Sequence, residues 1–279
     1  MMKFTKMQGC GNDYIYVNAF EERVLDPGAA SIKLSDRHFG IGGDGLVLIG
    51  PSETGDFDMD MYNADGSRSG MCGNAIRCVG KYLYERGLTD KTELKISTQS
   101  GIRTLKLNVA DGVVETVRVE MGAPDFRCSA IPVAAEGESF LNQTIEVLGK
   151  PWQVSGVSVG NPHCVTFVDF DPMELDFPQI GPAFENHPMF PQRVNTEFVR
   201  VIDRHTLQMR VWERGSGETW ACGTGATATL AVAAKLGLSD PSADILLRGG
   251  TLHIDWDQES NLLYMTGPAT FVFDGEITL

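Results

Sequence analysis

Two stretches decide the fold: Met71-Cys72-Gly73-Asn74-Ala75 and, with its cysteine 150 positions later, Ala221-Cys222-Gly223-Thr224-Gly225-Ala226. In each stretch a Cys-Gly pair opens a segment of helical spacing that ends before a glycine. The second segment has small or apolar residues on every side, which is typical of a helix surrounded by protein. We therefore predict two buried helices, Cys72–Arg86 and Cys222–Leu236, each beginning at a cysteine.

Other residues repeat at nearly the same offset. Gly11-Asn12-Asp13 resembles Gly160-Asn161-Pro162-His163, and the two asparagines are 149 positions apart (12 to 161). Asn63 and Glu213 each lie nine positions before the cysteine of their half. Three matches within one residue of a common offset indicate an internal duplication. We predict two similar domains with a boundary near Met121.

The rest of the chain consists mainly of short segments rich in β-branched residues and bounded by Gly, Pro, Asn or Asp, which is typical of strands. Asp26-Pro27 predicts the start of a further helix that runs toward Arg37, and another helix is expected near Pro178–Glu185. Many strands, few helices and no βαβ repetition predict an α+β fold with a curved sheet around each buried helix. The predicted strands are Tyr14–Ala19, Leu46–Ile49, Phe57–Tyr62, Leu94–Thr98, Val113–Glu120, Val154–Val159, Cys164–Val168, Glu197–Ile202, Leu207–Trp212, Thr251–Trp256, Leu263–Thr266 and Thr270–Phe273.

Composition excludes several classes of protein. The 279 residues are 42% hydrophobic and 22% charged, as in a globular chain of about two domains. A net charge of −14 without any basic run argues against nucleic acid as a partner. No apolar run resembles a signal peptide or approaches the ~20 residues of a membrane span, so we expect a soluble cytoplasmic protein without a membrane partner. The six cysteines are expected to be reduced, and no spacing of ligands predicts a metal.

The two Cys-Gly helix starts suit acid–base chemistry. A helix N-terminus carries unpaired N–H groups and partial positive charge, which bind a carboxylate and lower the pKa of a thiol from about 8.5. Two such ends facing each other would hold one carboxylate between two thiols. One thiol could then remove a proton from an α-carbon while the other returns one to the opposite face. The remaining cysteines are expected to be ordinary buried side chains: Cys10, Cys78, Cys128 and Cys164.

These motifs resemble those of the diaminopimelate epimerase family, in order and over nearly the whole chain. The resemblance implies two similar α+β domains, 1–121 and 122–268, each a curved sheet or barrel around a central helix. It further implies an active site in the cleft between the domains, with residues 269–279 joining the first domain as a strand. The motifs that carry it are Gly9-Cys10-Gly11-Asn12-Asp13-Tyr14, Asn63-Ala64-Asp65-Gly66-Ser67, the two cysteine stretches quoted above with Ile76-Arg77-Cys78 after the first, Gly160-Asn161-Pro162-His163-Cys164, Glu213-Arg214-Gly215-Ser216-Gly217-Glu218-Thr219 and Met265-Thr266-Gly267-Pro268-Ala269.

The resemblance also implies an activity: interconversion of LL- and meso-diaminopimelate without pyridoxal phosphate or another cofactor, in lysine and peptidoglycan precursor biosynthesis. It assigns Cys72 and Cys222 as the two acid–base groups, and Glu213 and His163 as groups that tune the thiols and the reacting ammonium. The guanidinium of Arg214 can grip a carboxylate with two parallel hydrogen bonds. The full set of substrate-binding residues that it implies is Asn12, Asn63, Gly73, Asn74, Asn161, Asn195, Glu213, Arg214, Gly223 and Thr224.

Two positions depart from the pattern of some family members. This chain has Gly45 where some carry a substrate-binding Gln, and Phe273 where some carry Tyr at a dimer contact. A homodimer with Phe273 at its contact is still expected, because Phe keeps the apolar packing. Two alternatives remain: a proline- or hydroxyproline-type racemase, and a redox switch in which Cys72 and Cys222 form a reversible disulfide.

Overall fold

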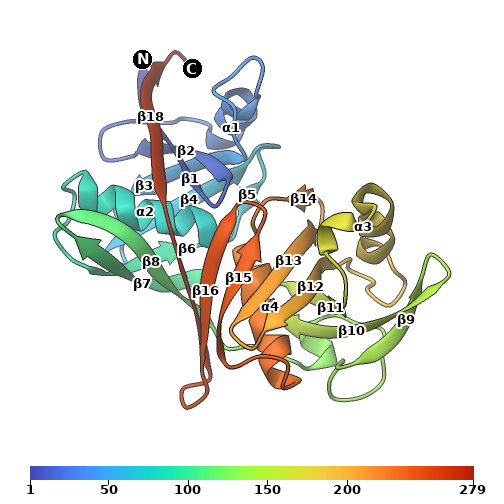
Figure 1. Cartoon of the computed structure of the whole chain (residues 1–279). Coiled ribbons are helices and arrows are strands. Elements are labelled where there is room, and N and C mark those ends of the chain that lie inside the picture. Colours follow the sequence, from blue (N-terminus) through green and yellow to red (C-terminus); the bar gives the residue numbers. More distant parts are fainter. The chain divides into compact units, whose positions relative to one another are not determined.

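The computed structural model describes all 279 residues, which form two compact units. The first unit comprises Met1–Glu120 together with Thr266–Leu279, and the second comprises Met121–Met265. In Figure 1 the first unit holds the blue segments and the final red strand, and the second holds the yellow and orange segments.

The first unit is a mixed sheet with two helices (Figure 1). Helix α2 packs on β1, β2 and β7, and its residues 73–83 are all buried. This helix is therefore the central element of the unit. The elements of the first unit are β1 (Met2–Gly9), β2 (Asn12–Asn18), α1 (Pro27–Ser35), β3 (Gly45–Gly50), β4 (Phe57–Asn63), β5 (Arg68–Ser69), α2 (Gly73–Glu85), β6 (Glu93–Thr98), β7 (Gly101–Ala110), β8 (Val113–Gly122) and β18 (Thr270–Ile277).

The second unit is likewise a mixed sheet, with α4 buried against β10, β11, β12, β13, β15 and β16. Helix α3 packs on β12 and β13. The elements of the second unit are η1 (Cys128–Ala130), β9 (Gln143–Val147), β10 (Lys150–Ser158), β11 (Pro162–Val168), η2 (Pro172–Glu174), α3 (Phe177–Glu185), β12 (Asn195–Asp203), β13 (Thr206–Glu213), β14 (Gly217–Thr219), α4 (Gly223–Lys235), β15 (Ser242–Leu247), β16 (Gly250–Asp257) and β17 (Leu262–Gly267). The end of β17 belongs to the first unit.

The two units share one order of strand pairing. In the first, β1–β2 is antiparallel, β2–β3 parallel, β3–β4 antiparallel, β4–β6 parallel and β6–β7 antiparallel. In the second, β10–β11, β11–β12, β12–β13, β13–β15 and β15–β16 repeat this order. In each unit the buried helix follows a short strand that pairs with the fourth strand of this order, α2 after β5 and α4 after β14. The predicted duplicated α+β fold is confirmed.

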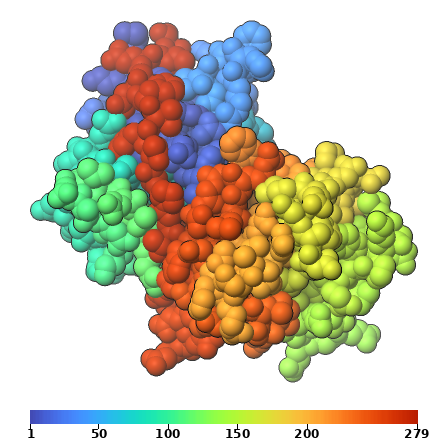
Figure 2. All heavy atoms as spheres, in the orientation of Figure 1, coloured from blue at the N-terminus to red at the C-terminus, as the bar shows by residue number.

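The last strand, β18, pairs with β1 in the first unit. The two strands run antiparallel from Met2 opposite Ile277 to Gln8 opposite Thr270. Figure 2 shows the red spheres of the C-terminal segment against the blue spheres of the N-terminal one. Phe273 packs edge-on against Phe4 at 5.8 Å between ring centroids, and 48% of its surface stays exposed. An apolar side chain thus remains on the surface of this strand.

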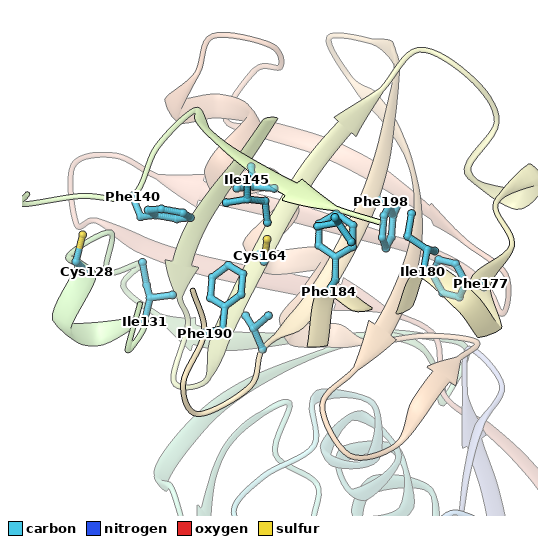
Figure 3. Close-up of a cluster of buried hydrophobic side chains, with 13 residues drawn as sticks. Cys128, Ile131, Phe140, Ile145, Cys164, Phe177, Ile180, Phe184, Phe190 and Phe198 are labelled. Carbon is cyan, nitrogen blue, oxygen red and sulfur yellow. The ribbon is translucent and has the colours of Figure 1, made fainter. Parts of the chain in front are cut away.

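An aromatic cluster fills the core between the sheet and α3 in the second unit (Figure 3). Phe177, Ile180 and Phe184 recur at helical spacing along α3 and are buried. The ring of Phe184 meets that of Phe198 on β12 edge-on, with centroids 5.0 Å apart, a favoured aromatic geometry. This core fixes β12 and its neighbour β11, which carry part of the candidate site.

All four predicted helices are present within two residues of their expected ends. Asp26 caps α1 as predicted, since its side chain accepts the N–H of Ala29. Four longer strands were not predicted: β1, β7, β9 and β15. None of the helices combines the length and the apolar character that crossing a membrane requires.

Candidate active site

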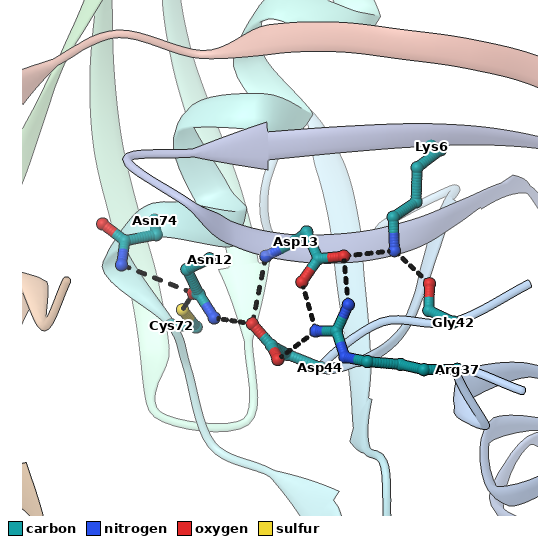
Figure 4. A network of polar contacts seen from close by, with 8 residues as sticks. All are labelled: Lys6, Asn12, Asp13, Arg37, Gly42, Asp44, Cys72 and Asn74. Carbon is teal, nitrogen blue, oxygen red and sulfur yellow. Dashed lines mark hydrogen bonds and ion pairs between the residues drawn. The ribbon is translucent and has the colours of Figure 1, made fainter. Parts of the chain in front are cut away.

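Cys72 is the N-cap of α2, and its sulfur accepts the backbone N–H of Ala75 at 3.5 Å. Its thiol also donates to Asn12 Oδ1 at 3.2 Å, and Asn74 Nδ2 donates to the same oxygen at 3.3 Å. The three side chains converge in Figure 4. A thiol therefore lies at a helix N-terminus, where unpaired N–H groups and partial positive charge favour an anion.

A charged network behind Asn12 fixes its amide (Figure 4). Asp44 Oδ2 accepts Asn12 Nδ2 at 2.6 Å and the backbone N–H of Asp13 at 3.0 Å. The carboxylate of Asp13 is held in turn by Lys6 at 2.6 Å and Arg37 at 2.7 Å. Because an ionised carboxylate only accepts hydrogen bonds, the amide nitrogen of Asn12 faces Asp44 and its oxygen faces the thiol.

Arg77 holds the first turn of α2 from within the unit. Its side chain is fully buried, and one terminal nitrogen donates to Gly73 O at 3.2 Å and Asn74 Oδ1 at 2.9 Å. Its Nε donates to Pro268 O at 3.1 Å, just before β18. The guanidinium therefore connects the returning C-terminal segment to the helix that carries Cys72.

Cys222 repeats the arrangement at the N-cap of α4. Its sulfur accepts the backbone N–H of Gly225 at 3.3 Å and lies 3.4 Å from Thr224 Oγ1. The side chain is buried. Burial raises the pKa of the Cys222 thiol well above its usual range, and the charges of Glu213 and Glu197 raise it further. The expectation that the helix N-terminus lowers the thiol pKa is therefore wrong for Cys222, which is protonated at neutral pH.

Polar side chains surround Cys222. His163 Nδ1 lies 2.7 Å from Glu197 Oε1, and His163 Nε2 lies 3.0 Å from Asn161 Oδ1. Asn161 Nδ2 donates to Thr224 Oγ1 at 3.4 Å. These contacts bring His163, which lies in β11, to the first turn of α4.

Glu213 also belongs to the surroundings of Cys222. The hydroxyl of Thr219 donates to its carboxyl group, and the Cys222 thiol forms a further hydrogen bond to it. Burial raises the pKa of Glu213, and these two hydrogen bonds oppose the rise. A carboxyl group therefore lies in contact with the thiol.

Asn195 and Arg214 form a second polar pair in this unit. The backbone N–H of Arg214 donates to Asn195 Oδ1 at 2.9 Å, and Asn195 Nδ2 donates to Pro162 O at 2.8 Å. The guanidinium of Arg214 makes a 3.2 Å hydrogen bond to Gln192 O. Asn195 thus fixes the backbone from which the guanidinium extends.

The structure groups most of the predicted site residues within their own units. In the first unit Asn12, Cys72 and Asn74 are in contact, with Gly73 between the last two, whereas Asn63 donates to Ser67 Oγ at 3.0 Å, outside this group. In the second unit the group comprises Asn161, His163, Glu213, Cys222, Gly223 and Thr224.

Two carboxylates of these groups were not predicted, Asp44 and Glu197. Asp44 belongs to a Gly-rich loop that carries no regular pattern, and Glu197 lies at the start of a predicted strand. At Gly45 a Cβ would lie 2.1 Å from Tyr62 O, so the backbone here leaves no room for a side chain. No side-chain contact with a ligand can come from this position.

Comparison with known proteins gives relatives over the whole chain. The sequence model of the diaminopimelate epimerase family matches residues 4–127 and 156–272. A diaminopimelate epimerase of Acetivibrio thermocellus is 54% identical over 281 residues, which cover 100% of this chain and 99% of the relative. Another, from Agathobacter rectalis, is 52% identical and covers 100% of both chains.

Solved structures share the fold at low sequence identity. A protein of the phenazine biosynthesis PhzF family from Enterococcus faecalis gives a TM-score of 0.73 at 13% identity and covers 100% of this chain and 99% of its own. A hydroxyproline epimerase from Agrobacterium vitis gives 0.68 at 14% identity, with 99% and 90% covered. At such identities the likeness concerns the fold alone.

Proposed function

The chain belongs to the diaminopimelate epimerase family, and we propose that it interconverts LL- and meso-diaminopimelate with Cys72 and Cys222 as its two acid–base groups. The observation that carries the proposal is the repeated helix start. In each unit a cysteine caps a buried helix, is followed by glycine, and accepts the N–H three residues on. A two-base mechanism for inverting one carbon uses two such groups, one for each face of the substrate.

In the proposed reaction both cysteines act on one α-carbon of the bound substrate. Backbone N–H groups at the starts of α2 and α4 hold the reacting α-carboxylate. One thiolate takes the α-proton, and the electron pair of the broken C–H bond moves onto the α-carbon and its carboxylate. The other thiol then gives its proton to the opposite face. One thiolate and one thiol are present before and after the step, so the chemistry requires no cofactor.

The burial of Cys222 supports a choice of which thiol starts with the proton. Because its pKa lies well above the usual range, Cys222 begins as the acid and Cys72 as the base for one stereoisomer. The two cysteines exchange roles in the reverse direction. His163 and Glu213 tune the charge near Cys222, since Glu213 contacts the thiol and His163 offsets the negative charge of Glu197.

Specificity for diaminopimelate rests on the end of the substrate that does not react. Arg214 binds the distal carboxylate, and Asn12, Asn63, Asn74, Asn161 and Asn195 complete the polar lining. A cyclic imino acid such as proline has no distal carboxylate and would leave the Arg214 guanidinium unpaired. The fold does not separate these two activities, since a hydroxyproline epimerase shares it.

We further propose that the protein is a cytoplasmic homodimer that serves lysine and peptidoglycan precursor synthesis. The dimer contact would include β18, where Phe273 and Val272 expose 48% and 54% of their surfaces. Light scattering on the eluate of a size-exclusion column tests this, because a dimer has twice the 30.4 kDa mass of the chain. Phe273→Asp should shift the dimer toward monomer.

The activity is tested with pure protein and LL-diaminopimelate, without added cofactor. Chiral chromatography should show meso-diaminopimelate forming until the two stereoisomers reach equilibrium. Racemisation of proline in place of diaminopimelate would support a racemase of cyclic imino acids. Absence of both reactions, together with a reversible Cys72–Cys222 disulfide, would support a redox switch and overturn the proposal.

A further inference from the structure

The carboxyl group of Glu197 is buried beside the second thiol and has no role in the reaction as proposed above. Glu197 and His163 are both fully buried, with 2.7 Å between Oε1 and Nδ1. The other oxygen, Oε2, has no hydrogen-bond partner. A Cβ on Gly225 would lie 2.8 Å from Oε1, so the carboxyl group is packed against the first turn of α4. Burying an unpaired carboxyl oxygen costs stability. The burial of Glu197 is therefore better explained by a role of the contact between its Oε1 and His163.

A continuous chain of hydrogen bonds runs from this carboxyl group to the thiol. His163 Nε2 lies 3.0 Å from Asn161 Oδ1, and Asn161 Nδ2 lies 3.4 Å from Thr224 Oγ1. Thr224 Oγ1 lies 3.4 Å from Cys222 Sγ. All members come from the second unit: His163 on β11, Asn161 just before that strand, Glu197 on β12, and Cys222 and Thr224 at the start of α4.

The burial of the pair determines the direction of the donors. Asn161 Oδ1 can only accept, so His163 Nε2 carries a hydrogen. Then either an imidazolium faces the Glu197 carboxylate, or protonated Glu197 donates to Nδ1, and in both cases the pair is neutral. The opposite orientation of the Asn161 amide requires a bare Nε2. With a bare Nε2, the pair either carries a net negative charge without solvent or places the Glu197 proton on Oε2, which has no acceptor, and both states are costly.

We propose that Glu197 is a positioning residue that keeps the hydrogen on His163 Nε2 and thereby directs the donors of the chain toward the sulfur of Cys222. With Asn161 donating to Thr224 Oγ1, the hydroxyl hydrogen of Thr224 is free to donate to Cys222 Sγ. That donor stabilises the thiolate that Cys222 becomes once its proton has passed to the substrate carbon. The inference deepens the proposed function and rests on it, because it takes Cys222 as an acid–base group.

Three other ionisable groups surround the pair: Cys164 on β11, Glu213 on β13 and Cys222 on α4. Burial raises the pKa of all three, and the charge of Glu197 raises those of the two thiols further. Both thiols therefore stay protonated between pH 6 and 8.

The direct test is the hydrogen position on His163 in the unaltered protein. Long-range proton–nitrogen NMR correlations on ¹⁵N-histidine-labelled protein distinguish the two ring nitrogens, and loss of one signal set in His163→Gln assigns them. We expect Nε2 to carry hydrogen throughout pH 6 to 8. A bare Nε2 with hydrogen only on Nδ1 would overturn the proposal.

A substitution then tests the role of Glu197. Glu197→Gln keeps the shape, but its amide can present either a donor or an acceptor to Nδ1, so both tautomers of His163 should appear. We expect kcat to fall about tenfold with KM within twofold, since the change acts on proton transfer. The matched control is Thr196→Val, because the neighbouring Thr196 hydroxyl is buried without a partner. It should keep the single tautomer and the parental kcat.

The outcomes separate this inference from the proposed function. A single Nε2–H tautomer and parental kcat in Glu197→Gln would refute the positioning role while leaving the epimerase activity intact. If Glu197→Gln does not fold, the measurement on the unaltered protein still decides. The NMR result requires no substrate, so a protein inactive on diaminopimelate with hydrogen on Nε2 would refute the function and leave the hydrogen-bond polarity standing.

Discussion

Cys72 and Cys222 occupy the same position in the two units. Each caps a helix of 13 residues, with closely similar backbone angles of φ −126° and ψ 120° at Cys72 and φ −122° and ψ 111° at Cys222. Each sulfur accepts the backbone N–H three residues later. Their partners differ, since the Cys72 thiol donates to an amide oxygen, whereas Cys222 lies beside a hydroxyl and a carboxyl group.

Replacing either cysteine should abolish epimerisation. In Cys72→Ser or Cys222→Ser one face of the substrate carbon has no acid–base group of suitable pKa, so kcat should fall by at least about 10³-fold. Chiral chromatography measures the rate, and circular dichroism measures folding. Cys128→Ala is the control, since Cys128 belongs to the core of the second unit, and it should remain active. Full activity in either serine variant would remove that cysteine from the mechanism.

Alkylation of Cys222 should be slow at neutral pH and rise steeply with pH. Burial raises its pKa above 9, so the reactive thiolate should increase about tenfold per pH unit through pH 9. Glu213→Gln removes a negative charge that raises this pKa, and the profile should therefore move to lower pH. Iodoacetamide labelling of Cys72→Ser, followed at the Cys222 peptide by mass spectrometry, gives the rates. A plateau reached below pH 8 would contradict this account.

Arg214 should govern the choice of substrate. Arg214→Leu removes the bidentate partner of the distal carboxylate and should lower kcat/KM for diaminopimelate about 100-fold or more. Lysine, which lacks that carboxylate, should be an extremely poor substrate of the unaltered enzyme. Steady-state kinetics with both amino acids test this. Comparable turnover of lysine and diaminopimelate would refute the assignment of Arg214.

Arg77 should contribute strongly to stability. In Arg77→Met the carbonyl oxygens of Gly73 and Pro268 lose a buried charged donor, and unfolding should be easier by about 2–4 kcal/mol. Urea denaturation measures the difference. Arg23→Met is the matched control, because Arg23 is exposed, and it should stay within about 0.5 kcal/mol of the parent. A loss below about 1 kcal/mol in Arg77→Met would show that these carbonyls find other donors.

The fold was predictable where local signals were strong. The caps at Asp26, Cys72 and Cys222 and the closing glycines located the helices, and the motif offsets indicated the duplication. Strand β1 was missed because it carries two lysines, and Lys6 becomes buried only through its ion pair with Asp13. Strand β7 was missed because few of its residues are buried. In both strands, tertiary contacts supply what the local pattern lacks.

The site residues that lie in sequence motifs were predictable, and the supporting carboxylates outside the motifs were not. The cysteines and the residues near them in sequence lie in repeated or recognisable stretches. Glu197 was counted only as a strand residue, since nothing local indicates that it meets His163, 34 positions earlier. Asp44 likewise reaches Asn12 only because the parallel pairing of β2 with β3 brings their starts together. Such supporting carboxylates depend on strand register, which the sequence pattern does not specify.

The central claim, that two thiols act on opposite faces of one carbon, is tested most directly by the reaction in heavy water. The abstracted proton should stay on one sulfur while the other delivers a deuteron, so early product should carry deuterium at the inverted α-carbon. Recovered substrate should remain largely protiated, starting from either stereoisomer. Substantial protium at that carbon in early product would indicate a single base and contradict the account.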